Sequence, residues 1–154
     1  MFGLSKAQKT RFIINLYAPY IGAGVKVDFI SDDFREIKVS MKLTKLNRNY
    51  VGTHFGGSLY SMVDPFYMLQ LMNILGKDYI VWDKSADIDF IAPGKSKVTA
   101  EFHISDELIQ DIKDKTASGD KYLPSLPVNI MSEEGELVAK ANKTLYIRKK
   151  PAKR

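Results

Sequence analysis

Hydrophobic and polar positions change their spacing several times along the chain, and this spacing predicts the order of the elements. Residues 5–18 carry apolar side chains at helical spacing after Ser5, a residue type that often caps helices, so we expect a first helix that ends near Pro19. Residues 25–30 and 34–43 alternate apolar and polar side chains on either side of the turn "SDD". This pattern is typical of a β-hairpin.

The central segment differs because it is apolar on nearly every side. After a loop over residues 44–54, the stretch from Gly57 to Leu75 consists mostly of Leu, Met, Val, Phe and Tyr, and Gly76 follows it. The pattern predicts one long helix that ends at this glycine. Such a helix must be covered by protein on all sides, and a curved antiparallel sheet wrapped around it would do so.

Four further β-like stretches follow the central segment. They cover residues 79–92, 97–105, 122–132 and 137–148, and "SDELIQDIKDKT" between the second and third predicts a short amphipathic helix capped by Ser105 or Asp106. Strands and helices do not alternate, which argues against a parallel sheet. The sequence therefore predicts an α+β fold in a single domain over residues 1–148, with a long central helix, about six strands and a basic tail over residues 149–154.

Composition and charge exclude several classes of protein. No part of the 154 residues approaches the roughly 20 successive apolar residues of a membrane span. The chain has no cysteine, which excludes disulfides and thiolate metal sites and fits a cytoplasmic protein, and with only two histidines we expect no metal site. The net charge of +5 equals the charge of the terminal stretch "RKKPAKR", so we expect no nucleic-acid partner.

One acid, Asp64, interrupts the apolar central segment. A buried carboxylate costs several kcal/mol unless it is paired, so the residue is either a structural acid bonded to a neighbouring strand or a functional one. On a helical wheel it shares one stripe with Gly57, Ser61, Met68 and Leu71. Pro65 follows the acid and cannot donate to the carbonyl of Ser61, so we expect a kink beside Asp64.

The stretch "HFGGS" before the central segment has the features of an oxyanion site. Gly56 and Gly57 would begin the helix, where N–H groups lack acceptors, and glycine allows close approach of a ligand. Gly56 and Asp64 are eight residues apart, which is roughly 12 Å along a helix. One small carbonyl group cannot contact both, so an enzymatic site requires the acid of a second subunit and makes dimerisation a condition.

These residues resemble the motif of the hotdog-fold thioesterases, in particular those of phenylacetate and hydroxybenzoyl-CoA metabolism. The motif places Asn or Gln, Gly, His-Gly-Gly and an acid at positions matched here by Asn49, Gly52, Gly56, Gly57 and Asp64. From about Arg11 to Arg148 the chain is still more similar to the C-terminal domain of YiiD-type proteins, through "NRNYVGTHFGGSLYSMVDPFYM", "YIVWDKSADIDFIAPG" and "KTLYIR". Phe55 replaces the histidine of the motif, and His54 lies one residue earlier.

The resemblance implies a role for each matching position. The N–H of Gly56 would polarise the thioester carbonyl, Asn49 would orient the substrate or the water, and Asp64 of the partner subunit would be the nucleophile or general base. The residues expected around the substrate are Gly57, His54, Phe55, Ser61 and Met68. This implies hydrolysis of an acyl-CoA or similar acyl thioester by a homodimer or a dimer of dimers, with no cofactor besides the coenzyme A of the substrate.

Two alternatives stay open at this stage. A protein with Phe55 in place of the histidine could bind acyl-CoA or a lipid-like ligand without turnover. Hydration or dehydration of an acyl thioester is a third function found on the same fold, and the glycine-rich motif argues against it.

Smaller expectations concern the strand stretches. The stretch 79–92 is apolar at alternate positions and would pair across a two-fold axis as an edge strand. We expect Trp82 in the core, the acids of "DKSADID" on a solvated face, and His103 at the surface.

Overall fold

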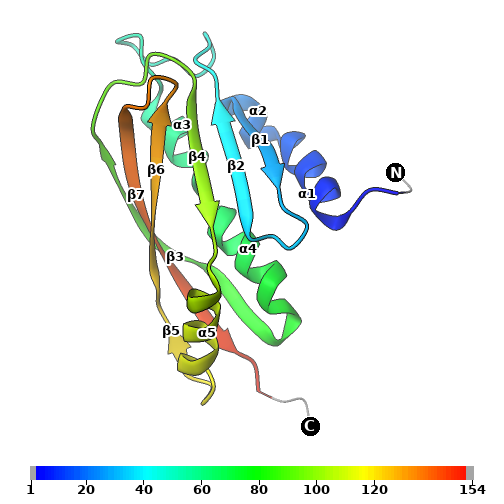
Figure 1. Ribbon diagram of the computed structural model, residues 1–154. Helices are drawn as coiled ribbons and strands as arrows, with labels where there is room; N and C mark the ends of the chain where they lie inside the picture. The colour runs from blue at the N-terminus through cyan, green and yellow to red at the C-terminus, as the bar shows by residue number, and fades with distance from the viewer. Residues whose placement is uncertain (1–2, 152–154) are drawn as a thin grey trace.

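The computed structural model describes residues 3–151 as an antiparallel sheet packed against helices (Figure 1). The elements, in chain order, are α1 (Lys6–Asn15), α2 (Ala18–Ala23), β1 (Val25–Ile30), β2 (Glu36–Met41), α3 (Gly56–Ser61), α4 (Phe66–Leu75), the 3-10 turn η1 (Gly76–Asp78), β3 (Tyr79–Phe90), β4 (Val98–His103), α5 (Asp106–Lys115), β5 (Lys121–Tyr122), β6 (Ser125–Ser132) and β7 (Leu137–Lys149).

The strands form one sheet in the order β1-β2-β4-β6-β7-β3, and the short β5 pairs with β7. Every pair is antiparallel, and β1 and β2 form the expected hairpin. The α+β fold with an antiparallel sheet curved around the central helical segment is therefore confirmed. β3 lies at the end of the sheet, and within residues 3–151 no other strand pairs with its outer side.

The core lies between the sheet and the helices behind it (Figure 1). Alternate residues of the strands point into this core, where they meet the buried face of α4. The ring of Phe66 from α4 is fully buried and packs against Phe102 of β4 and Tyr20 of α2, with ring centroids 5.0 and 6.0 Å apart. Burial of each such side chain contributes about 1.5–3 kcal/mol, so this layer holds the helices on the sheet.

The central helical segment is interrupted, whereas the sequence predicted one long helix over residues 57–75. The helix α3 ends at Ser61, α4 begins at Phe66, and Met62–Pro65 form turns between them. The interruption has the expected physical cause, because Pro65 lacks an N–H and cannot continue the hydrogen-bond ladder of α3. Asp64 therefore lies in a turn between two helices rather than on a continuous helix face.

The first helix begins as expected and ends earlier. Ser5 caps α1 through its side chain and forms a capping box with Gln8. The expectation that the helix reaches Pro19 is wrong, because α1 ends at Asn15 and Pro19 lies in the first turn of α2. Proline is accommodated in the first turn of a helix, where its missing N–H has no partner to lose.

Three other details differ from the sequence prediction. The expected strand over residues 122–132 is divided into β5 and β6 at Leu123–Pro124, where the proline cannot donate to the ladder. Trp82 is not in the core: its side chain is 56% exposed on the edge strand β3, where it packs against Tyr146. Lys149 belongs to β7 rather than to a tail, and Lys153 and Arg154 lie outside the described residues.

Two surface features complete the fold. His103 is exposed on β4, as expected, and Ser105 caps α5 through its side chain. None of the helices in the part of the chain that the structure describes has the length and hydropathy needed to cross a membrane.

Candidate active site

The loop before α3 is held in place by two asparagine side chains. Asn47 is buried and donates to the carbonyls of Ala23 and Lys42. The side-chain amide of Asn49 donates to the Thr53 hydroxyl at 2.9 Å and to the carbonyl of His54 at 3.2 Å. Its oxygen accepts from the N–H groups of Val51 and Thr53. Asn49 therefore fixes the shape of the loop that leads to the glycine pair.

His54 is buried and connects this loop to the turn after β3. Its Nε2–H donates to the carbonyl of Ser96 at 2.8 Å, since a carbonyl oxygen can only accept. The backbone N–H of His54 donates to the carbonyl of Gly94. Burial lowers the pKa of His54, and the bond to Ser96 opposes that effect only in part, so the neutral imidazole is favoured.

Gly56 and Gly57 form the first turn of α3, as the sequence predicted. Their N–H groups have no acceptor within residues 3–151, as expected at a helix start. An aromatic ring lies against each glycine: a Cβ atom at Gly56 would stand 2.9 Å from Cζ of Phe90, and one at Gly57 would overlap the ring of Phe55. A larger residue at either position would therefore displace an aromatic side chain.

A cavity of about 420 Å³ adjoins the first of these glycines. Its lining consists of Asn49, Thr53, His54, Gly56, Leu59 and residues 90–94. The structure thus brings together three of the residues singled out from the sequence, namely Asn49, His54 and Gly56. It places them at the junction between the start of α3 and the end of the edge strand β3.

Asp64 does not line this cavity, and it is bonded to a buried lysine instead. Its Oδ1 accepts from Nζ of Lys143 on β7 at 2.7 Å. The lysine side chain is only 1% exposed, whereas that of Asp64 is 48% exposed. The acid of the motif is therefore one end of an ion pair whose other end lies within the core.

Two more side chains contact the same ammonium group. Oδ1 of Asp83 on β3 lies 3.2 Å from Nζ of Lys143, and Nζ donates to the hydroxyl of Tyr60 at 3.3 Å. Burial raises the pKa of Asp83, and the Lys143 charge counteracts this rise in part. Burial by itself would lower the pKa of Lys143, but the bond to Asp64 and the charge of Asp83 outweigh it, so the net direction is upward.

Lys143 is a residue of this cluster that the sequence pattern did not single out, and Asp83 lies elsewhere than predicted. Along β7 the residues Ala139, Ala141, Lys143, Leu145 and Ile147 are all buried, so the alternation of the strand does carry the signal: a lysine occupies an inward-facing position. The acids of "DKSADID" do not all lie on a solvated face, because the Asp83 side chain is only 24% exposed and points to Lys143.

The remaining residues of the expected site lie outside the cavity. Phe55 precedes α3 with its side chain 56% exposed. The hydroxyl of Ser61 donates to the carbonyl of Gly57 at 2.8 Å within α3. Met68 is partly buried on α4 against the core. The structure therefore brings only some of the expected residues to the cavity and leaves Asp64 apart from it.

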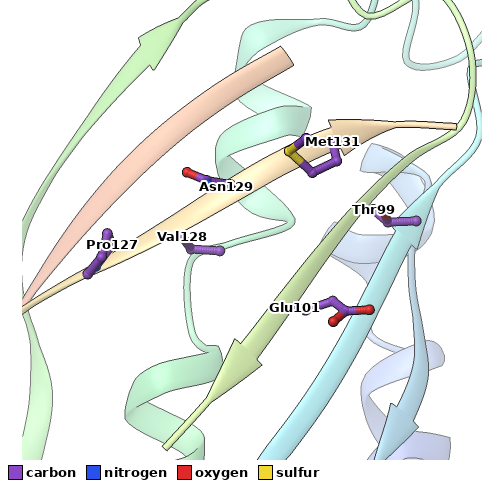
Figure 2. A pocket seen from close by; sticks show the side chains of 6 residues that line it. All are labelled: Thr99, Glu101, Pro127, Val128, Asn129 and Met131. Carbon is purple, nitrogen blue, oxygen red and sulfur yellow. The ribbon is translucent and has the colours of Figure 1, made fainter. Parts of the chain in front are cut away.

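A second hollow, also of about 420 Å³, lies between β4 and β6 (Figure 2). These strands pair over only three residue pairs and then diverge, which leaves the hollow open. Its one ionisable lining residue, Glu101, is paired with Lys38 at 3.1 Å, and no residue of the motif contributes to it. Within residues 3–151, no group of three or more His, Asp or Glu side chains is arranged to hold a metal ion.

Solved structures of thioesterases share this architecture. A protein of unknown function from Pseudomonas aeruginosa, described as a probable thioesterase, is 17% identical, with a TM-score of 0.79 over 92% of this chain and 94% of that chain. A thioesterase from Haemophilus influenzae is 14% identical (TM-score 0.66, 95% and 92% covered). Thioesterase superfamily member 2 from Mus musculus is 18% identical (TM-score 0.66, 93% and 98% covered). This likeness shows that the chain has the hotdog fold.

Residues 6–147 match the family described as "Domain of unknown function (DUF4442)", and the chain therefore belongs to this family. No curated protein sequence matches the chain at a significant level. The closer similarity to YiiD-type proteins stays a prediction.

Proposed function

We propose that the protein hydrolyses acyl thioesters, with acyl-CoA as the substrate class, and that it acts as a cytoplasmic homodimer. The observation that carries the proposal is the cavity at the start of α3, where the N–H of Gly56 has no acceptor in the described chain and is enclosed by Asn49, His54 and the end of β3. The thioesterases that share the fold support the choice of reaction.

In the proposed reaction the thioester carbonyl oxygen accepts a hydrogen bond from the N–H of Gly56. Asp64 of a second subunit accepts a proton from the attacking water, or attacks the carbonyl carbon itself. Negative charge develops on the carbonyl oxygen, and the N–H donor stabilises it in the transition state. The carbon–sulfur bond then breaks, and the thiolate of coenzyme A leaves and takes up a proton. Where Asp64 attacks the carbon directly, the product is an anhydride between the acyl group and Asp64, and water then hydrolyses it to release the acid and restore the carboxylate.

The separation of the two groups supports a shared site. Gly56 lines the cavity and Asp64 does not, because α3 and a turn lie between them in one chain. The outer side of β3 is free in the described chain and ends beside the cavity, so two sheets joined through β3 would bring a second subunit to this region. Asn49 acts in this proposal by holding the loop, since its amide groups are used there.

A non-catalytic acyl-CoA or lipid-like ligand-binding protein is the second candidate. It is favoured by Phe55, which stands where the thioesterase motif has histidine and whose ring lies against Gly57. This candidate uses the same cavity and predicts affinity for acyl thioesters without turnover.

Thiol release from short, aromatic, medium and long acyl-CoAs tests the proposal. A thiol-reactive dye is suitable because the chain contains no cysteine and gives no background. We expect turnover of at least one acyl class and a loss of about 100-fold or more in kcat for Asp64→Asn. Asp32→Asn, which changes an exposed acid in the turn between β1 and β2, is the matched control and should keep wild-type activity.

The same panel decides between the two candidates. Turnover that survives in Asp64→Asn would remove this acid from the mechanism. Binding measured by calorimetry with no turnover of any chain length would replace the hydrolase with the ligand-binding protein.

A further inference from the structure

Lys143 is the most unusual side chain of the core. It occupies an inward-facing position of β7 between Ala141 and Leu145, where an aliphatic residue would fill the same space without an ammonium group to desolvate. A buried charge is stable only when partners replace its water, and replacement of a buried ion pair by apolar residues is often neutral or stabilising. Packing alone therefore gives no reason for a lysine at this position.

The partners of Lys143 link the core to the motif acid. Its Nζ lies within 3.3 Å of three oxygens, from Asp64 in the turn, Asp83 on β3 and Tyr60 on α3. The oxygens of Asp64 and Tyr60 accept hydrogen bonds from this ammonium group, whereas Oδ1 of Asp83 interacts with it by charge and has no hydrogen-bond partner among the described residues. The shortest of the three contacts, at 2.7 Å, is the one to Asp64, whose side chain stays half exposed.

The cluster holds more negative than positive charge. Lys143 carries one positive charge, whereas Asp64 and Asp83 can carry two negative charges between them. The other titratable groups near Asp64 are Tyr60 of α3 and Tyr20 of α2. Burial raises the pKa of both hydroxyls, so both are neutral at ordinary pH, and the Tyr20 hydroxyl has no hydrogen-bond partner among the described residues. The two carboxylates thus share one cation, and a change at either Lys143 or Asp83 alters the field at Asp64.

We infer that Lys143 is a positioning residue for Asp64, whose carboxylate it anchors through Oδ1 in the turn between α3 and α4. This inference rests on the proposed function, because it assigns the buried ion pair a role in orienting Asp64 for the reaction. It makes Asp83 a second carboxylate that competes for the same ammonium group.

Two variants of the same lysine test the inference. Lys143→Met removes the donor to Oδ1 of Asp64, so we expect kcat to fall by about 100-fold while KM changes little. Lys143→Arg keeps a cation with N–H donors at this position, so it should recover part of the lost kcat. Lys140→Met, which removes an exposed lysine of the same strand, is the control and should keep the wild-type kcat.

A purely structural role would lower stability while the folded protein keeps its kcat. A wild-type kcat in the folded Lys143→Met protein would overturn the inference while leaving the hydrolase proposal intact, provided that Asp64→Asn remains inactive. If Lys143→Met fails to fold, Lys143→Gln, whose shorter side chain does not reach Oδ1 of Asp64 in the same way, takes its place and should show the same loss of kcat.

A measurement without substrate keeps the inference separate from the proposed function. The side-chain carboxyl carbon of Asp64 can be assigned by its loss in Asp64→Asn and observed by NMR at one fixed pH. A displaced signal in Lys143→Met, with no displacement in Lys140→Met, would support the positioning role even if no acyl-CoA is hydrolysed. An unchanged signal in Lys143→Met would contradict it.

Discussion

The ring of Phe90 lies directly over Gly56, so that a Cβ atom on this glycine would stand 2.9 Å from Cζ of Phe90. This contact joins the first turn of α3 to the last residue of the edge strand β3. Both residues line the same cavity. The proposed oxyanion donor is therefore placed by a glycine–aromatic contact between two elements.

We expect Gly56→Ala to reduce kcat/KM by about 10- to 100-fold, because the new methyl group displaces Phe90 or the start of α3 and small displacements of reacting groups are costly. The Phe90 side chain is 58% exposed, so it has room to move and stability should change little. Steady-state kinetics beside a thermal melt would separate the two effects.

The double variant Gly56→Ala/Phe90→Leu provides the control. A smaller side chain at position 90 removes the overlap, so we expect it to recover part of the lost activity. A double variant no more active than Gly56→Ala would show that the clash with Phe90 is not the cause.

Mixing two inactive variants tests whether the site is shared between subunits. Asp64→Asn lacks the acid and Gly56→Val blocks the cavity, but a mixed dimer contains one site with Gly56 from one chain and Asp64 from the other. Random exchange of subunits should restore about a quarter of wild-type activity. Mixtures that stay inactive after proven subunit exchange would mean that each chain uses its own acid.

The buried His54 makes stability depend on pH in a defined direction. Burial lowers the pKa of His54 in the folded chain, whereas the unfolded residue titrates near 6.5. Below about pH 6.5 the unfolded state binds more protons, so this residue lowers the free energy of unfolding as the pH falls toward its folded-state pKa.

Urea midpoints at pH 7.5 and pH 5 would measure this effect. We expect the wild type to lose more stability between these values than His54→Gln, whose amide can still donate to Ser96. His103→Gln, at the exposed histidine of β4, should behave as the wild type. An equal pH dependence for all three proteins would contradict the assignment.

Phe66 should be among the most sensitive core positions. Its ring is fully buried between Phe102 and Tyr20, and Phe66→Ala would leave a cavity at a cost of about 3–5 kcal/mol in the free energy of unfolding. Phe12→Ala on α1, where the ring is 50% exposed, should change this free energy by no more than about 0.5 kcal/mol. Chemical denaturation of both variants would check the difference.

The strands were predictable because their alternation is local. The expected hairpin strand over residues 25–30 has the same bounds as β1, and the expected strand over 137–148 differs from β7 by one residue. Proline accounts for two of the misjudged boundaries. At Pro19 it begins a helix rather than ending one, and at Pro124 it divides a strand. At both positions the backbone needs no N–H donor, so proline fits there. The local sequence pattern does not show where a donor is unnecessary.

The candidate site was predictable only in part, for a similar reason. Asn49, His54 and Gly56 lie within eight residues of one another, so one loop brings them together. Asp64 and Lys143 are 79 residues apart, and their contact depends on the register of β7 and on the turn after α3. The inward position of Lys143 could be deduced from alternation, but its partner could not.

The interruption between α3 and α4 separates two tasks within the central segment. The position of Asp64 is set by a turn and by its bond to Lys143, while α4 presents its side chains to the core from its own first residue onward. Substitutions in α4 can therefore change the packing around this helix during evolution without rotating Asp64, because the acid is not part of the helix. In a continuous helix, a change in the packing of the α4 residues would also move Asp64.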